Sequence, residues 1–155
     1  MDKTNALRLL DKEKIKYEIH EYDNTCTDGL LIAKLLNEDP DSVFKTLVTV
    51  ANTKEYFVFC IPVSQTLDLK LAAKAASVKS IEMIKQKELL PLTGYIHGGC
   101  SPVGMKTKFK TFFDEAITLY DDIYVSAGRV GMQMHIKTND LINYIHAGIA
   151  NLTTK

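Results

Sequence analysis

The stretch Phe44–Pro62, FKTLVTVANTKEYFVFCIP, decides how the fold of this chain is interpreted. Two runs rich in β-branched and aromatic residues, 44–51 and 56–62, flank the polar tetrapeptide Asn52–Glu55. Such residues favour strands, and a short polar connection between two such runs is typical of a hairpin. The stretch therefore predicts two antiparallel strands joined by a tight turn.

Upstream of this hairpin, the sequence predicts two helices and one strand. Apolar residues recur at helical spacing over residues 3–14, and residues 17–22 alternate as a strand does. The loop at 23–29 contains Asp28, whose carboxylate is of the type that caps helix N-termini. We therefore expect a second helix from this point to Leu36.

Downstream of the hairpin, helices and strands follow one another irregularly. The predicted helices cover residues 67–76, 85–90 and 140–147, the last capped by Thr138 or Asn139, and the predicted strands cover 80–83, 111–114, 123–126 and 132–136. Clusters of strands interrupted by pairs of helices favour a mixed sheet with helices outside over a regular βαβ winding. Since the chain has no repeat and no linker, we expect a single α/β domain of the α+β type over residues 1–155.

Composition argues against several classes of protein. The 155 residues are 46% hydrophobic and carry 19 basic and 19 acidic side chains, so net charge predicts no partner. No apolar stretch approaches the roughly 20 residues of a membrane span, and the N-terminus leads into an amphipathic helix rather than a signal peptide. Three cysteines without a CxxC pair indicate neither a disulfide framework nor a zinc knuckle. We therefore expect a cytoplasmic protein.

The charges are unevenly spread along the chain. Between Leu67 and Lys110, eight lysines stand against three acidic residues. This basic segment could meet a polyanion with one face of the molecule, or its lysines could simply be solvated on helix surfaces.

The segment Thr93–Lys106, TGYIHGGCSPVGMK, is the first candidate for a binding site. It opens with a β-like approach at 94–97 and continues with glycines, which let backbone N–H groups press against a ligand. Pro102 then restricts the backbone at the exit. We expect the backbone of this segment to bind a carbonyl, a ribose or a phosphate, unless the segment is only a tight connection between strands.

Two further segments could complete such a site. Lys45 opens an apolar strand, where its ammonium either points to solvent or is held at the sheet end to grip an ester carbonyl or a phosphate. The small-residue loop within Tyr124–Gly131 is either a hairpin turn or a second wall of the pocket, with Ser126 as a hydrogen-bonding partner. Neither loop has a GxGxxG or P-loop pattern, so nucleotide binding has weak support.

A cysteine nucleophile and a metal site are both disfavoured. Cys100 follows His97 by three residues, but residues at this spacing in a loop point in different directions, and catalytic Cys–His pairs usually come from separate segments. His20, His135 and His146 show no metal-ligand spacing with one another. We therefore predict no metal site and no cofactor.

Three ordered motifs together resemble the YbaK/EbsC family. They are VFKTL at 43–47, the glycine segment from TGY to SPVG at 93–104, and YVSAG at 124–128, with further similarity at 19–22 and 67–70. Members of this family are bacterial deacylases that clear cysteine from tRNA(Pro) mischarged by prolyl-tRNA synthetase, and they are related to the editing domain inserted in many such synthetases. The resemblance implies a compact mixed sheet, partly barrel-like and flanked by helices.

The resemblance also implies roles for individual residues. The expected catalytic positions are Lys45 and the backbone of Gly98 and Gly99, and the expected substrate-binding residues are Tyr22, Thr46, Ser101, Ser126 and Gln133. In the family mechanism the substrate's own cysteine thiol attacks its acyl carbonyl, a cyclic thiolactone forms and the tRNA leaves, so the protein needs no nucleophile. Well-known members carry an acidic residue where this chain has Gln133, which changes the group expected to meet the substrate's ammonium.

The function implied by the resemblance is trans-editing deacylation of Cys-tRNA(Pro), with Cys-tRNA(Cys) as a second candidate substrate. The expected partners are aminoacyl-tRNA and, transiently, prolyl-tRNA synthetase, because a chain of zero net charge is expected to bind tRNA weakly by itself. No membrane partner is expected. Three alternatives stay open: a non-catalytic module that binds aminoacyl ends or a synthetase, an Ala-tRNA(Pro) deacylase, and a thiol hydrolase that uses Cys100.

Overall fold

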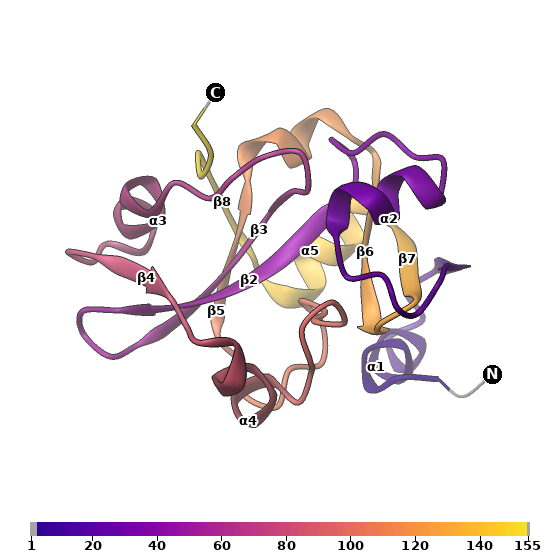
Figure 1. Ribbon diagram of the computed structural model, residues 1–155, viewed down its shortest axis with the longest axis horizontal. Helices are drawn as coiled ribbons and strands as arrows, with labels where there is room; N and C mark the ends of the chain where they lie inside the picture. The colour runs from indigo at the N-terminus through magenta and orange to yellow at the C-terminus, as the bar shows by residue number, and fades with distance from the viewer. Residues whose placement is uncertain (1–2, 155) are drawn as a thin grey trace.

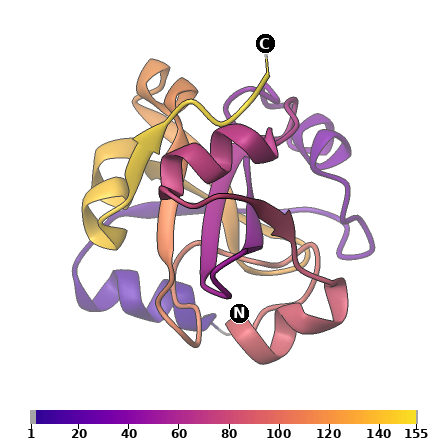
Figure 2. The ribbon, with the colours of Figure 1, turned by 90° about the vertical axis from the view of Figure 1, so that its left-hand side faces the viewer.

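The computed structural model describes residues 3–154, which form two β-sheets with helices around them (Figure 1). The strands are β1 (Tyr17–Glu21), β2 (Phe44–Ala51), β3 (Tyr56–Pro62), β4 (Ile81–Met83), β5 (Lys110–Asp114), β6 (Asp122–Arg129), β7 (Met132–Lys137) and β8 (Gly148–Ala150). The helices are α1 (Asn5–Lys12), α2 (Gly29–Leu35), α3 (Leu69–Ala76), α4 (Leu89–Thr93) and α5 (Thr138–Ile145), with short 3₁₀ helices η1 (Gln86–Glu88) and η2 (Glu115–Leu119). Figure 2 shows the helices on the outside of the central strands.

The two sheets are of different kinds. One contains three antiparallel strands in the order β1-β7-β6, and the other contains five strands in the order β4-β2-β3-β5-β8. The larger sheet is mixed, because β3 pairs with β5, and β5 with β8, in parallel. An isolated bridge between Val43 and Tyr124 joins the two sheets, which in the described part of the chain do not close into a barrel. The expected mixed α+β fold is confirmed.

The predicted hairpin is β2 and β3, with both strands at the predicted bounds. Phe44 pairs with Pro62 and the register continues to Val50 opposite Tyr56. Strand β3 lies between β2 and β5 and is buried over nearly its whole length, which explains its unbroken apolar run. In the turn, the Asn52 side chain accepts hydrogen bonds from the backbone N–H groups of Lys79 and Ser80, and so holds the chain that enters β4.

Two helix starts follow from capping residues that the sequence displays. Asp28 caps α2 by accepting the Leu30 N–H at 3.0 Å, as predicted. Asp68 caps α3 in the same way, through the N–H groups of Lys70 and Leu71. Within residues 3–154, no helix is long and apolar enough to cross a bilayer.

Besides a separate cluster that includes Ala72 and Ala73 of α3, the structure has a hydrophobic core cluster to which both sheets contribute. Its buried members include Leu7 of α1, Phe44 of β2, Phe113 of β5, Val125 of β6 and Met134 of β7. Elements from both ends and the middle of the chain contribute to this cluster. Each sheet therefore buries its apolar face only by packing against the other sheet and its helices.

Three local predictions need correction, and one strand has no counterpart among the predicted elements. Residues 94–97 form a loop and no strand, because Gly94 takes a left-handed conformation (φ +83°) that ends α4. The helix expected at 85–90 is divided into η1 and α4. Neither Thr138 nor Asn139 caps α5, since Lys137 is the N-cap residue and the Thr138 hydroxyl donates to the Tyr120 carbonyl instead. Strand β8 was not predicted.

The three-stranded sheet has one apolar and one polar face. Side chains alternate along each strand, so Ile19, Val125 and Met134 point into the core. The opposite face carries the next residues along each strand, among them His20, Ser126 and Gln133, which lie side by side in the register. This polar face faces α2 and the start of β2, and it supplies one wall of the candidate site.

Candidate active site

A cavity of about 140 Å³ lies where β2, the start of α2, the glycine loop and the polar face of the three-stranded sheet meet. Five of the predicted site residues line it: Lys45, Thr46, Gly98, Ser126 and Gln133. The fold thus brings together residues from each of the three sequence motifs, and Gln133 of β7 joins them from a fourth segment.

Lys45 is half-buried in the wall of this cavity rather than directed to open solvent. Burial lowers the pKa of its ammonium below the ordinary value, and the nearby Asp28 carboxylate partly offsets this effect. Among residues 3–154, no hydrogen bond or ion pair engages the Lys45 ammonium. A cation without a partner in a small cavity is available to an anionic or partly negative group of a ligand.

Ser126 and Gln133 are cross-strand partners on β6 and β7, both nearly buried. The Ser126 hydroxyl accepts the Gly128 N–H at 3.2 Å. The Gln133 side-chain oxygen is buried and has no hydrogen-bond partner among the described residues. An unsatisfied buried acceptor of this kind is costly unless a ligand donates to it.

Gly98 forms part of the cavity wall by close contact with Thr27. It has a φ of +86°, and a Cβ at this position would lie 2.5 Å from the Thr27 methyl carbon. Both features restrict the position to glycine. The glycine loop is thereby held against the loop that precedes α2.

Three predicted site residues lie outside the cavity wall. Gly99 packs on the turn between β6 and β7, since its Cβ would lie 2.8 Å from the Val130 nitrogen, and its own N–H donates to the Ile96 carbonyl. Gly99 therefore joins two loops, and the contact expected between its backbone and a ligand stays a prediction. Ser101 is fully buried, and its hydroxyl accepts the Val103 N–H.

Tyr22 is the third of these residues. It directly follows β1, and its backbone N–H donates to the Gly131 carbonyl at 3.0 Å. Its phenolic oxygen is buried and without a hydrogen-bond partner among the described residues, like the Gln133 oxygen. Tyr22 thus keeps an unused buried polar atom, and it is not part of the cavity lining.

His97 and Cys100 both line the cavity. Burial raises the pKa of the Cys100 thiol to about 12, an effect that an interaction with Thr93 partly opposes. The thiol is therefore protonated at neutral pH, and no hydrogen bond joins it to His97 within residues 3–154. The arrangement lacks the activated thiolate that a cysteine nucleophile requires.

The cavity also contains residues that sequence reasoning missed. They include Thr27 and the apolar side chains of Ile32, Val63 and Leu89. No local pattern distinguishes these residues, because their place in the wall depends on packing between distant segments. Outside this cavity, three side chains of types that can bind a metal come close together: Glu18, His20 and His135. Their neighbour Gln133, the cross-strand partner of His20, does line the cavity.

Comparisons with known proteins agree with this picture. Residues 30–144 match the family described as "Aminoacyl-tRNA editing domain". A protein of Enterococcus faecalis (strain ATCC 700802 / V583), named "Putative Cys-tRNA(Pro)/Cys-tRNA(Cys) deacylase EbsC", is 40% identical over 157 residues, which cover 99% of this chain and 94% of the relative.

Two solved structures share the fold at low sequence identity. One is described as "Crystal structure of a putative trans-editing enzyme for prolyl tRNA synthetase", with 20% identity, a TM-score of 0.87 and full coverage of both chains (100% and 100%). The other, described as a hypothetical protein, has 18% identity and a TM-score of 0.89, and the match covers 97% of this chain and 100% of that one. With its cavity built by the three motifs and a family match over most of its length, this chain belongs to the aminoacyl-tRNA editing domain family.

Proposed function

We propose that this protein is a trans-editing deacylase that removes cysteine from mischarged Cys-tRNA(Pro), with Cys-tRNA(Cys) as a second substrate. Family membership and the name carried by the 40% identical Enterococcus relative support the substrate class. The proposed site consists of the cavity-lining residues Lys45, Thr46, Gly98, Ser126 and Gln133.

The observation that supports this proposal most is the unpartnered ammonium of Lys45 in a cavity of about 140 Å³. Pockets that hold drug-sized ligands measure roughly 300–1,000 Å³, so this smaller cavity suits a group the size of an aminoacyl moiety better than a drug-sized ligand. An ester carbonyl placed beside Lys45 gains negative charge as it is attacked, and a fixed cation in a partly dry site stabilises that charge.

In the proposed reaction the nucleophile comes from the substrate. The cysteinyl sulfur attacks the acyl carbonyl carbon, a C–S bond forms, and the C–O bond to the terminal ribose breaks. The thiol proton passes to the ribose oxygen, so the products are a cyclic cysteine thiolactone and free tRNA. The attack is intramolecular and has a large proximity advantage, which agrees with a cavity whose own thiol, Cys100, stays protonated.

Gln133 is the proposed acceptor for the α-ammonium of the aminoacyl group. Its buried side-chain oxygen lacks a partner, and an ammonium that donates to it would remove the cost of that burial. A neutral amide attracts a cation less strongly than the acidic residue of well-known family members. Contact with the side chain of the amino acid must then contribute more to selection.

Prolyl-tRNA synthetase is the proposed, transient partner. Phosphate contacts supply most of the sequence-independent affinity for nucleic acid, and this chain has zero net charge. Selection of tRNA(Pro) by the synthetase would compensate for weak binding by the deacylase alone.

A deacylation panel tests the proposal. Cys-, Ala-, Ser- and Pro-tRNA(Pro) and Cys-tRNA(Cys) are each incubated with the purified protein, with and without the synthetase. We expect rapid release from both cysteinyl substrates and slow release of serine, because a hydroxyl is a much weaker nucleophile than a thiol. Rapid release of serine would indicate an activated water instead of the substrate thiol.

Gln133 also favours a second candidate, an Ala-tRNA(Pro) deacylase, because the weaker ammonium site relaxes the choice of amino acid. Alanine has no thiol, so preferential release from Ala-tRNA(Pro) would exclude the thiolactone route. Tight binding of every aminoacyl-tRNA without turnover would identify a non-catalytic module.

A further inference from the structure

A second polar cluster lies on the same face of the three-stranded sheet as the candidate site, one step further along the strands. Glu18 of β1 and Tyr124 of β6 are the cross-strand partners of His135 on β7. In the adjacent row, His20 is the partner of Gln133. Since residues two apart on a strand share a face, Glu18, His20, Tyr124 and His135 all project to one side.

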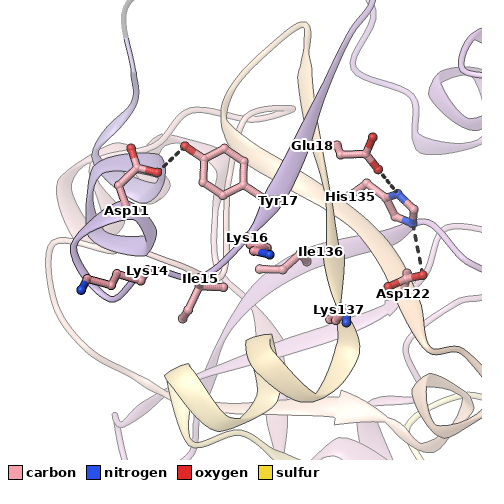
Figure 3. Close-up of a pocket in the computed structure, with 10 residues that line it drawn as sticks. All are labelled: Asp11, Lys14, Ile15, Lys16, Tyr17, Glu18, Asp122, His135, Ile136 and Lys137. Atoms are coloured by element: carbon pink, nitrogen blue, oxygen red, sulfur yellow. Dashed lines mark hydrogen bonds and ion pairs between the residues drawn. The ribbon is translucent and has the colours of Figure 1, made fainter.

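His135 is held in a defined orientation within this cluster. Its ring stacks on the ring of Tyr124, with centroids 4.4 Å apart and an angle of 4° between the planes. Its Nδ1 lies 3.2 Å from a Glu18 carboxylate oxygen, and its Nε2 lies 3.9 Å from an Asp122 oxygen. Figure 3 shows the imidazole between these two carboxylates, one from β1 and one from β6.

His20 completes a group of three potential metal ligands. Its ring meets the His135 ring nearly edge-on, with centroids 6.1 Å apart. One ligand atom each from Glu18, His20 and His135 lies within 4.8 Å of the others. Ligands around a tetrahedral zinc ion lie about 3.3 Å apart. The Glu18 oxygen already lies 3.2 Å from His135 Nδ1, and the Glu18 side chain is 75% exposed, so it has room to reorient toward an ion.

The electrostatic surroundings favour a cation at this place. The Tyr124 phenol, whose ring stacks on His135, donates a hydrogen bond to a Glu38 carboxylate oxygen at 2.7 Å, so a further carboxylate is held at the edge of the cluster. The pocket beside this cluster is also lined by three lysines, Lys14, Lys16 and Lys137 (Figure 3). Their positive charges repel a metal cation, and their protonated amines cannot bind it. Two carboxylates, those of Glu18 and Asp122, flank the imidazole directly.

We propose that Glu18, His20 and His135 form a binding site for a divalent transition-metal ion of the zinc class. Two imidazole nitrogens and one carboxylate oxygen form a donor set that zinc accepts, with water in the fourth position. If Nδ1 of His135 binds the ion, its Nε2–H points toward Asp122, which then acts as the outer carboxylate that fixes the ring.

The proposed site joins two strands. Strand β1 is an edge of the three-stranded sheet and pairs only with β7 among the described strands. An ion held by Glu18 and His20 on one strand and His135 on the other adds a cross-link between them. Because the unfolded chain has no preformed site, the ion stabilises the folded protein in proportion to its affinity and concentration.

Binding is measured on tag-free protein, first stripped with a chelator, by calorimetric titration with Zn²⁺ and by the visible spectrum of Co²⁺. We expect one ion per chain and a higher melting temperature in excess Zn²⁺. X-ray absorption of the zinc-loaded protein is expected to show nitrogen and oxygen neighbours at about 2.0–2.2 Å and no sulfur. A sulfur signal would assign the ion to cysteine and overturn the proposal.

Variants assign the ligands. His20→Gln and His135→Gln are expected to raise the Kd for Zn²⁺ at least tenfold and to abolish the gain in melting temperature. Glu18→Gln is expected to weaken binding severalfold, and its exposed position means that it should fold normally. The matched control is His146→Asn, since His146 lies at the end of α5 with a φ of +54°, which asparagine tolerates.

Two results would overturn the proposal. One is the absence of saturable binding of one ion per chain to the wild-type protein. The other is unchanged Zn²⁺ affinity in folded Glu18→Gln and His135→Gln proteins. Neither readout uses catalytic activity, so the metal site and the proposed deacylation succeed or fail independently.

Discussion

At the scale of single residues, Lys45 has the environment that sets it apart from the other lysines of the chain. It is half-buried in the cavity wall, burial lowers its pKa, and the nearby Asp28 carboxylate partly offsets that effect. An unpaired charge costs a surface lysine little free energy, because water solvates it. A partly buried lysine is less well solvated, so a negative group placed beside it stabilises the charge more strongly. The residue is therefore suited to stabilising charge that appears only during a reaction.

Lys45→Ala is expected to lower the deacylation rate on Cys-tRNA(Pro) by about 10²–10³ or more, because one preorganised donor to a developing oxyanion contributes roughly this factor. Lys45→Arg should restore little activity, since a planar guanidinium does not fit the place of a point charge in a tight cavity. Single-turnover rates measure the effect. The control is Lys12→Ala, an exposed lysine of α1. A near-wild-type rate for folded Lys45→Ala would refute the proposed site.

Cys100→Ala is expected to keep most of the activity. Burial raises the pKa of this thiol to about 12, so it carries almost no thiolate at neutral pH, and the reacting sulfur belongs to the substrate. The measurement is the deacylation rate of the variant beside its melting temperature. A loss of two or more orders of magnitude in a folded variant would revive the thiol hydrolase.

At the scale of elements, the position of the glycine loop depends on its contact with the β6–β7 turn. Gly99 lies so close to this turn that a Cβ would meet the backbone of Arg129 and Val130 at 2.8–3.2 Å. Backbone atoms cannot move aside cheaply. The contact therefore sets where His97, Gly98 and Cys100 enter the cavity wall.

Gly99→Ala is expected to destabilise the protein by about 1–3 kcal/mol and to lower deacylation, because the added methyl forces the two loops apart. The control is Gly94→Ala in the same loop. Gly94 also requires a left-handed φ of +83°, but its Cβ would meet nothing closer than 3.9 Å. The control should lose stability through strain and keep its activity. Thermal unfolding and deacylation rates are compared for both, and equal activity in the two variants would contradict the contact.

At the scale of the whole molecule, the buried charge of Lys45 lowers the stability of the fold. Its pKa in the folded protein lies below the ordinary value of 10.5, so between these two values the unfolded chain binds more protons than the folded one. The contribution of Lys45 to the free energy of unfolding therefore rises with pH in that window. Below the window the charged ammonium costs stability.

Lys45→Met is accordingly expected to be more stable than the wild type at neutral pH. This difference should shrink as the pH rises toward and beyond 10.5, where Lys45 is neutral in both states. Denaturant unfolding of both proteins at a series of pH values from 7 to 11 gives the difference in their free energies of unfolding. Groups that titrate alike in the two proteins do not contribute to this difference. A difference that does not change with pH would show that burial does not penalise the charge.

Much of the fold was predictable where the signal is local. The hairpin strands 44–51 and 56–62 and the Asp28 cap were predicted correctly, because alternation, turn residues and capping depend on neighbours in sequence. Strand β8 was missed because three residues become a strand only through parallel pairing with β5. The loop at 94–97 was predicted as a strand because its apolar residues resemble one, whereas the left-handed Gly94 prevents it.

The sequence alone determined the hairpin, the family and five of the residues that line the cavity, since motifs persist where the chemistry depends on residue type. Only the tertiary structure placed Gly99 against the β6–β7 turn and gave the buried Ser101 hydroxyl its hydrogen bond from the Val103 N–H. It alone also brought His20 beside His135, which are far apart in the sequence. The physical reason is that the register between distant strands follows from the packing of the entire core, and no local pattern encodes it.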